Sequence, residues 1–181
     1  MQSREAVELI EGGVVGGGTW ADLGAGSGTF TRALAELVGA AGTVYAVDRD
    51  ARAMAWLTEG AERAGGARLL PMVADFRQRL PFEDLDGVLV SNALHFVHRA
   101  DQERVVGLLA SYLRPHGTLM VVEYDQRAGT PWVPHPVPPD LFAELAAAAG
   151  LSAPREVGRR RSRYGPRDIY AAVARRPDAE G

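Results

Sequence analysis

The stretch from Trp20 to Phe30 constrains the fold of this chain more than any other. A short apolar run ends in a carboxylate at Asp22, three glycines follow at alternate positions, and a helical pattern begins at Phe30. This order predicts a strand, a tight loop and a helix. Glycine lets a ligand lie directly against the backbone, and the helix presents free N–H groups and the positive end of its dipole. We therefore expect a bulky, at least partly anionic ligand here.

The glycine spacing indicates which kind of ligand this is. Residues 24–28 read Gly-x-Gly-x-Gly, whereas dinucleotide sites use Gly-x-Gly-x-x-Gly. Asp22 lies two residues before the first glycine, where its charge would repel a pyrophosphate. An NAD(P)-dependent oxidoreductase is the alternative, because it shares the strand-glycine-helix start, but it leaves Asp22 unexplained. A ligand that also carries a cationic group fits better.

A second acidic residue, Asp48, ends the next predicted strand, Thr43 to Val47, and lies 20 residues after Gly28. In a right-handed βαβ unit the second strand lies beside the first, so its carboxyl end comes next to the glycine loop. A carboxylate at this point can accept both hydroxyls of a ribose. The other interpretation, a cap for the following helix, fits Asp50 better.

The fourth predicted strand, Gly87 to Val90, should lie beside the first, where the strand order reverses and open α/β sheets bind their ligands. Asn92 and His95 follow it directly. His95 is a candidate general base, because histidine exchanges protons near neutral pH. A histidine at such a turn can equally be a capping or packing residue.

These motifs resemble those of the class I S-adenosylmethionine-dependent methyltransferases. The acid, the glycine spacing and the strand-loop-helix order match the first motif of that family, and Asp48 matches its second-strand acid. The segment Leu-Arg-Pro-His-Gly-Thr-Leu at 113–119 is similar to a family turn, with His116 in place of one glycine. The resemblance covers Thr19 to Ala174.

The resemblance implies S-adenosylmethionine as cofactor, S-adenosylhomocysteine as product and no metal. Asp48 would hold the ribose, Asp75 and Phe76 the adenine, and Asn92 the methionine part. Enzymes of this kind that methylate nucleic-acid bases carry Pro-Pro and an aromatic residue after the position of Asn92, and this chain does not. The implied cofactor-binding residues are Asp22, Gly24, Ala25, Gly26, Gly28, Asp48, Arg49, Asp75, Phe76 and Asn92.

The implied fold is α/β, a class I methyltransferase Rossmann-like fold. We expect a seven-stranded, mostly parallel sheet with an antiparallel last strand and helices on both faces, in one domain over residues 1–175, with a flexible tail at 176–181. An amphipathic helix over Ser3 to Glu11 precedes the sheet, either as a lid over the substrate or as a helix that only packs on the sheet. The proline-rich loop Arg127 to Pro139 is expected to contact the substrate, with Glu123 and Asp125 as reserve polar contacts.

Composition and charge indicate which partners the protein binds and in which compartment it lies. A net charge of −3 gives no overall field for nucleic acid or an anionic membrane. The basic run 159–161 is short, and it fits a charged edge strand better than a nucleic-acid patch. The chain has no cysteine, no signal-like N-terminus and no long apolar run, so we expect a cytoplasmic protein without disulfides.

The sequence thus predicts an enzyme that transfers the methyl group of S-adenosylmethionine to a small molecule. It identifies neither the acceptor, whose methylated atom can be O, N or C, nor the oligomeric state. The alternative from another class is a cofactor-binding scaffold, or a subunit that needs a partner before it transfers a methyl group.

Overall fold

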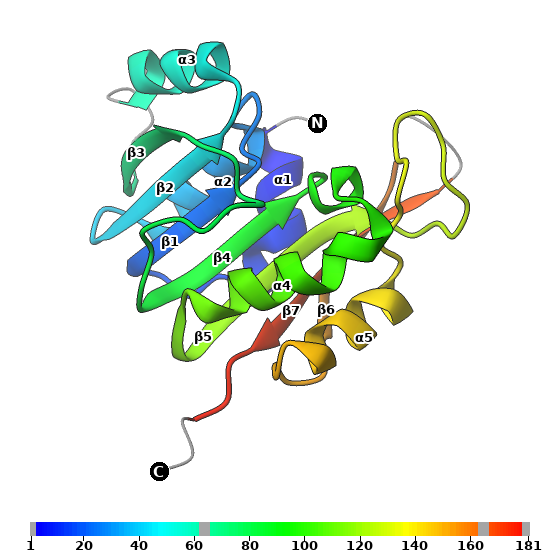
Figure 1. Ribbon diagram of the computed structural model, residues 1–181. Helices are drawn as coiled ribbons and strands as arrows, with labels where there is room; N and C mark the ends of the chain where they lie inside the picture. Colours follow the sequence, from blue (N-terminus) through cyan, green and yellow to red (C-terminus); the bar gives the residue numbers. More distant parts are fainter. Residues whose placement is uncertain (1–2, 62–65, 163–166, 179–181) are drawn as a thin grey trace.

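A computed structural model describes residues 3–61, 66–162 and 167–178. Within these ranges seven strands form a single sheet in the order β3-β2-β1-β4-β5-β7-β6 (Figure 1). β7 runs antiparallel to both of its neighbours, and the other pairs are parallel, as expected. The strands are β1 (Gly18–Leu23), β2 (Gly42–Asp48), β3 (Arg68–Val73), β4 (Leu85–Ser91), β5 (Leu113–Tyr124), β6 (Arg155–Arg161) and β7 (Asp168–Arg175).

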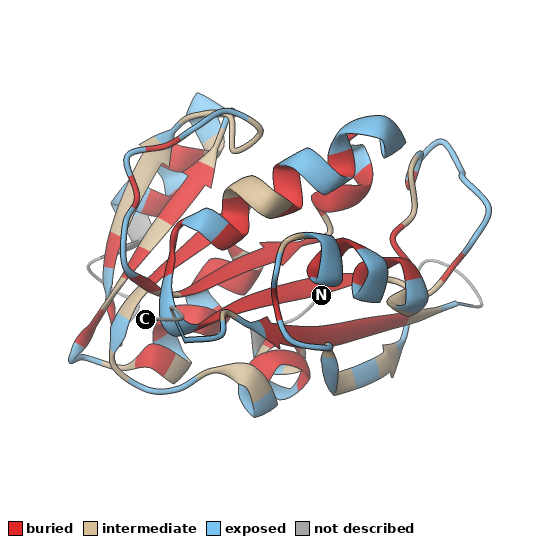
Figure 2. Ribbon diagram, turned by 60° about the horizontal axis from the view of Figure 1, so that its bottom comes forward, coloured by how far each residue is buried: buried red, intermediate tan, exposed pale blue. Residues whose placement is uncertain are grey.

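Helices cover both faces of the sheet. One face carries α1 (Ser3–Ile10) and α2 (Thr29–Val38), and the other carries α4 (Gln102–Ser111) and α5 (Pro139–Ala148). α3 (Ala51–Ala61) packs near β2 through Met54 and Leu57, which contact Ala46. Figure 2 shows the buried residues concentrated along the central strands and on the helix faces turned toward them.

The apolar pattern of each element explains its place. In α2, Phe30, Leu34 and Val38 recur at helical spacing and are buried, which drives the helix onto the sheet. β4 pairs with β1, and Gly87 of β4 lies opposite Trp20 of β1. A Cβ added to Gly87 would lie 2.3 Å from the Trp20 ring. A large side chain on β1 therefore requires the glycine on β4.

Two connections differ from the sequence-based expectation. The apolar spacing of Val105, Leu109 and Leu113 predicts a helix over Gln102 to Leu113. The helix ends at Ser111 instead, because Leu113 is fully buried and pairs with Leu85 as the start of β5. The segment Leu80 to Asp86, with its proline and acidic residues, is typical of a surface connection, yet Phe82 is buried with its ring centroid 5.0 Å from that of Tyr45. No helix lies between β3 and β4 in the described chain, and this aromatic contact helps to cover the sheet there.

The C-terminal strands carry paired charges. Arg159 forms ion pairs with Glu156 and Asp125 at 2.7 and 2.8 Å, and Arg160 forms one with Glu5 at 2.9 Å, so two arginines of the basic run already have partners within the fold. Beyond β7, Arg176, the first residue of the expected tail, donates its backbone N–H to the oxygen of Gly117. Residues 179–181 lie outside the described residues.

The helices in the described ranges are too short or too polar to cross a bilayer.

Candidate active site

A cavity of about 400 Å³ opens at the carboxyl ends of β1 to β4, at the point where the strand order reverses. Seven of the ten residues predicted to bind the cofactor line it: Gly24, Gly26, Asp48, Arg49, Asp75, Phe76 and Asn92. Asp22, Ala25 and Gly28 do not. Sequence reasoning missed the remaining lining residues, Ala74, Arg77, Ala93, Phe96 and Val97.

The three glycines of the loop have positive φ angles but serve different purposes. Gly26 has φ +50°, and a Cβ built on it meets no atom within 4 Å, so it faces the open cavity. A Cβ on Gly24 would lie 2.5 Å from the Cβ of Ala93, and one on Gly28 would lie 2.2 Å from Cδ2 of Leu57. Gly28 thus allows close packing against α3, and the buried Ala25 packs there too, away from the cavity.

Asp48 ties the glycine loop to the end of β2. Its Oδ2 accepts a hydrogen bond from the N–H of Gly26 at 2.8 Å, and its Oδ1 accepts one from the N–H of Asp50 at 2.9 Å. Each carboxylate oxygen keeps a further lone pair that can face the cavity. Asp50 accepts from the N–H of Arg52, so it is Asp50 that caps α3.

Asp22 lies fully buried beneath the glycine loop instead of lining the cavity. Its Oδ2 accepts a hydrogen bond from the Thr31 hydroxyl at 2.6 Å, and its Oδ1 has no hydrogen-bond partner among the described residues. Burial raises the pKa of Asp22 to about 7; the Thr31 hydrogen bond opposes this shift, and the charge of Asp48 adds to it. Apart from the Thr31 hydroxyl, no residue in the described ranges gives this carboxylate a hydrogen-bond donor or a cation that would stabilise its ionised form.

Asn92 supplies a second unpaired oxygen. Its φ of +49° turns the chain at the end of β4, its N–H donates to the oxygen of Val122, and its side chain lines the cavity. Oδ1 of Asn92 is buried and, like Oδ1 of Asp22, has no partner in the described part of the chain. Asn92 lies at the cavity and Asp22 lies just beneath its glycine loop, so two acceptors without partners near the cavity favour a ligand that brings positive charge and N–H donors.

Asp75 and Phe76 reach the cavity from the end of β3, but Asp75 already has a partner. Arg77 contacts both carboxylate oxygens, through Nε at 2.9 Å and Nη2 at 2.6 Å, and this holds the pKa of Asp75 below its usual range. The spacing of Asp75 and Arg77 in the sequence could have indicated this contact. An aspartate often accepts a hydrogen bond from the backbone N–H two residues later, as Asp75 does from Arg77.

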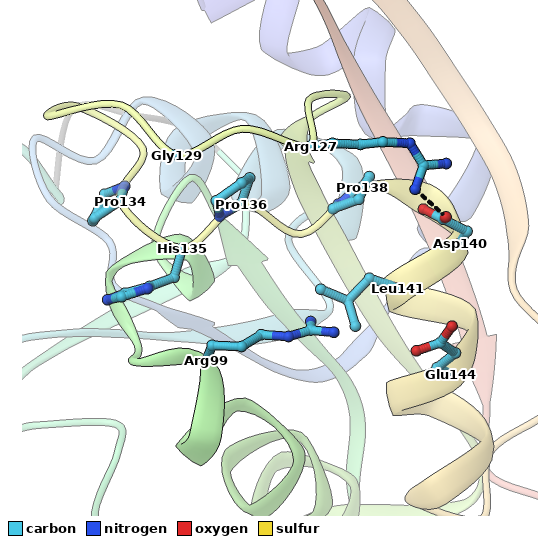
Figure 3. A pocket seen from close by; sticks show the side chains of 10 residues that line it. All are labelled: Arg99, Arg127, Gly129, Pro134, His135, Pro136, Pro138, Asp140, Leu141 and Glu144. Carbon is cyan, nitrogen blue, oxygen red and sulfur yellow. Dashed lines mark ion pairs between the residues drawn. The ribbon is translucent and has the colours of Figure 1, made fainter.

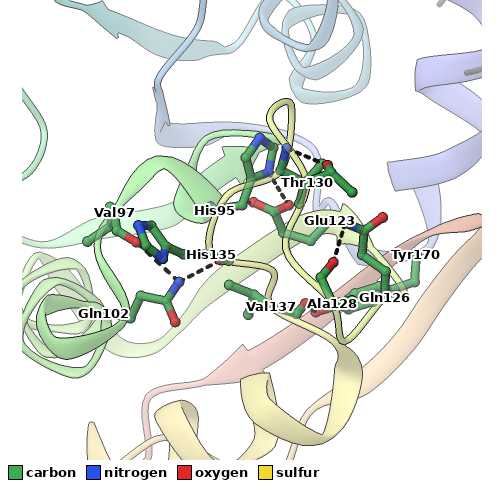
Figure 4. A network of polar contacts seen from close by, with 11 residues as sticks. His95, Val97, Gln102, Glu123, Gln126, Ala128, Thr130, His135, Val137 and Tyr170 are labelled. Carbon is green, nitrogen blue, oxygen red and sulfur yellow. Dashed lines mark hydrogen bonds and ion pairs between the residues drawn. The ribbon is translucent and has the colours of Figure 1, made fainter.

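His95 forms a buried pair with Glu123, which sequence reasoning did not predict (Figure 4). Nδ1 of His95 lies 2.6 Å from Oε2 of Glu123, and the backbone N–H of His95 donates to Oε1 at 3.1 Å. His95 is 2% exposed and Glu123 is fully buried. His95 does not line the cavity, although its neighbours Ala93 and Phe96 do.

The segment 125–138, called here the cover, lies over this pair and is held by polar contacts from several elements (Figure 4). His135 donates its backbone N–H to the oxygen of His95 and accepts from the Gln102 side chain at 2.9 Å. The Tyr170 hydroxyl donates to the oxygen of Val137 at 2.7 Å, and burial raises the pKa of Tyr170. The cover is thus a packed part of the fold.

A second cavity, of about 440 Å³, lies between the cover and α5 (Figure 3). Prolines of the cover and charged side chains line it, and Arg127 forms a 2.7 Å ion pair with Asp140 at its edge. No residue predicted to bind the cofactor lines it. We therefore place the candidate site in the cavity at the carboxyl ends of β1 to β4, because residues that follow each of these four strands line it.

Comparison with known proteins agrees with this geometry. Residues 21–117 match a family model described as "Methyltransferase domain". A search of curated protein sequences gives no match.

Three solved structures illustrate the likeness in fold. An S-adenosylmethionine-dependent methyltransferase from Methanosarcina mazei is 17% identical, with TM-score 0.73 over 93% of this chain and 97% of that one. The Burkholderia thailandensis 1,6-didemethyltoxoflavin-N1-methyltransferase, solved with bound 1,6-didemethyltoxoflavin and S-adenosylhomocysteine, is 19% identical, with TM-score 0.76 over 97% of this chain and 78% of that one. The [4+2]-cyclase SpnF is 18% identical, with TM-score 0.76 over 98% and 81%. At such identities the likeness establishes the fold, and a cyclase shares it.

Proposed function

The chain belongs to the methyltransferase domain family of class I, S-adenosylmethionine-dependent enzymes, and on that premise we propose that it methylates a small molecule. The observation that carries the proposal is the cavity at the carboxyl ends of β1 to β4. It combines an open Gly26, the part-exposed acid Asp48 and the unpaired Oδ1 of Asn92, with the unpaired Oδ1 of Asp22 just beneath the glycine loop.

Each of these groups has a place on the cofactor. Asp48 would accept the ribose hydroxyls, and the Phe76 ring would cover the adenine. Asp75 would meet the exocyclic amine only with the oxygen lone pairs that Arg77 leaves free. The ammonium and sulfonium of the methionine part would offset the acceptors left unpaired on Asp22 and Asn92.

S-adenosylmethionine supplies a methyl group that its positively charged sulfur already activates. The protein then has to align the acceptor with this methyl group and exclude water, and alignment of that kind lowers a barrier by roughly 7–11 kcal/mol. Asn92 and Phe96 line the end of the cavity beside β4, and His95 lies between them in sequence. We assign His95 as the base that receives a proton from the acceptor.

A small acceptor is the better fit to the cover. This segment is short and folds down onto η2 (Leu94–Phe96) and β7, and the Val133 and Val137 side chains anchor it in the core. The remaining opening suits a metabolite better than a macromolecule.

The proposal is tested by methyl-labelled S-adenosylmethionine added with a low-molecular-weight metabolite extract. We expect label in a small molecule, formed by the wild type and strongly reduced with D48A. Label that enters only protein or nucleic acid would contradict a small acceptor. Cofactor binding without transfer until a partner protein is added would instead indicate a partner-dependent subunit.

A further inference from the structure

The buried pair of Glu123 and His95 fixes more than the position of the imidazole ring. Glu123 uses both oxygens on the same residue, one on the backbone N–H of His95 and one on ring atom Nδ1. An ionised carboxylate only accepts hydrogen bonds, so Nδ1 must carry the proton of a neutral imidazole held this way. The lone pair of that ring then lies on Nε2.

Nε2 is placed where that lone pair can be used. It points away from Glu123 (Figure 4), and no described residue gives it a hydrogen-bond partner. The His95 side chain as a whole is 3% exposed. Phe96, next in the chain, is 59% exposed and lines the cavity.

We propose that Glu123 is the positioning residue that keeps His95 in the Nδ1–H form, and that the methyl acceptor is therefore a neutral hydroxyl or N–H group that must lose a proton. This inference rests on the proposed function and adds the class of acceptor to it. An acceptor that is already an anion, such as a thiolate, would gain nothing from the arrangement.

The reaction balances with these groups alone. The acceptor oxygen or nitrogen attacks the methyl carbon as its proton passes to Nε2 of His95. The carbon–sulfur bond breaks, and its electron pair stays on sulfur, which leaves as a neutral thioether. His95 becomes an imidazolium beside the Glu123 carboxylate, which stabilises that charge without taking the proton, until solvent removes it.

An isosteric change at Glu123 separates this role from a packing role. In E123Q the amide oxygen must face the backbone N–H of His95, because two facing N–H groups would repel. The amide NH₂ then faces Nδ1 and donates to it. The proton of the ring moves to Nε2, and the base is lost although the side-chain shape is kept.

Nitrogen-15 NMR of protein labelled at its four histidines reads this tautomer without any acceptor. We expect His95, assigned by comparison with H95Q, to carry its proton on Nδ1 at pH 8 in the wild type and on Nε2 in E123Q. The matched control E156Q, which changes an exposed glutamate paired with Arg159, should leave the wild-type pattern. A wild-type His95 protonated on Nε2, or on both nitrogens, would overturn the inference. The wild-type spectrum gives this result without the E123Q variant.

Titration with S-adenosylmethionine keeps the two proposals apart. We expect E123Q to bind it within about twofold of the wild type and to lose label transfer by 10²–10⁴-fold, the usual size of a general-base contribution. A wild type that does not bind the cofactor would contradict the proposed function, whatever the tautomer. Normal binding and normal transfer by E123Q would contradict the role of Glu123 alone.

Discussion

The two sides of the site are built differently. The proposed cofactor side, around the glycine loop and the end of β2, is open and consists of backbone N–H groups and part-exposed acids such as Asp48. The proposed acceptor side is closed, with the buried pair of His95 and Glu123 beneath the cover. The family match ends at residue 117, before Glu123 and the cover. The proposed cofactor side thus lies within the matched part of the chain, whereas Glu123 and the cover, on the proposed acceptor side, lie beyond it.

The largest effect should come from the acceptor side. H95A should lower turnover by roughly 10²–10⁴-fold with little change in S-adenosylmethionine affinity, because proton transfer belongs to the transition state. Label transfer and calorimetric titration of the same variant measure the two quantities. Turnover within a few-fold of the wild type would reduce His95 to a packing residue and would remove the contrast between the two sides.

On the cofactor side, D22N should stabilise the protein without ligand. The pKa of Asp22 is raised to about 7 in the folded state from 3.8, so the folded protein holds a proton that the unfolded chain releases between these values. The wild type therefore loses stability relative to D22N as pH rises from about 4 to 7, by on the order of 2–4 kcal/mol at pH 8.

Urea unfolding of both proteins at pH 5.5 and pH 8 measures this difference, which should be larger at pH 8. S-adenosylmethionine should bind the wild type more tightly as pH rises through about 7, because its ammonium favours the ionised carboxylate, and D22N should lack this trend. A stability difference between the two proteins that is the same at both pH values would contradict the shifted pKa.

D48A should weaken cofactor binding by roughly 10- to 150-fold, since a hydrogen bond to a charged group contributes about 1.5–3 kcal/mol. The matched control is D50A, which removes the cap of α3 and should cost about 1 kcal/mol of stability with little loss of affinity. Calorimetry and urea unfolding compare the two. Equal affinities for wild type and D48A would mean that Asp48 only holds the loop.

The smallest effects should separate two glycines of one loop. G26A places a methyl group in open cavity space, so it should reduce cofactor affinity and cost only about 1–2 kcal/mol of stability for its positive φ. G28A adds a clash with Leu57 to the same strain, so it should lose more stability. The reverse order in thermal unfolding and titration would show that the roles of Gly26 and Gly28 are exchanged.

Most of the fold, and most of the residues that line the cavity beside the glycine loop, could be predicted from sequence because the signals are local. The glycine spacing, Asp48 at a strand end and the 3.6-residue pattern of α2 each lie within a few residues. The pair of His95 and Glu123 joins residues 28 positions apart, through the pairing of β4 with β5. The sequence around His95 does not predict its contact with Glu123. The burial of Asp22 could not be predicted either, because it depends on how the loop and α2 pack above it.

The central claim is that the cavity at the carboxyl ends of β1 to β4 binds an adenosyl sulfur cofactor and not a dinucleotide. Calorimetric titration of the purified protein with S-adenosylhomocysteine and, separately, with NAD⁺ tests it most directly. We expect S-adenosylhomocysteine to bind at one site per chain with a loss of at least tenfold in D48A, and NAD⁺ to give no saturable heat. Saturable binding of NAD⁺ without binding of S-adenosylhomocysteine would contradict the account.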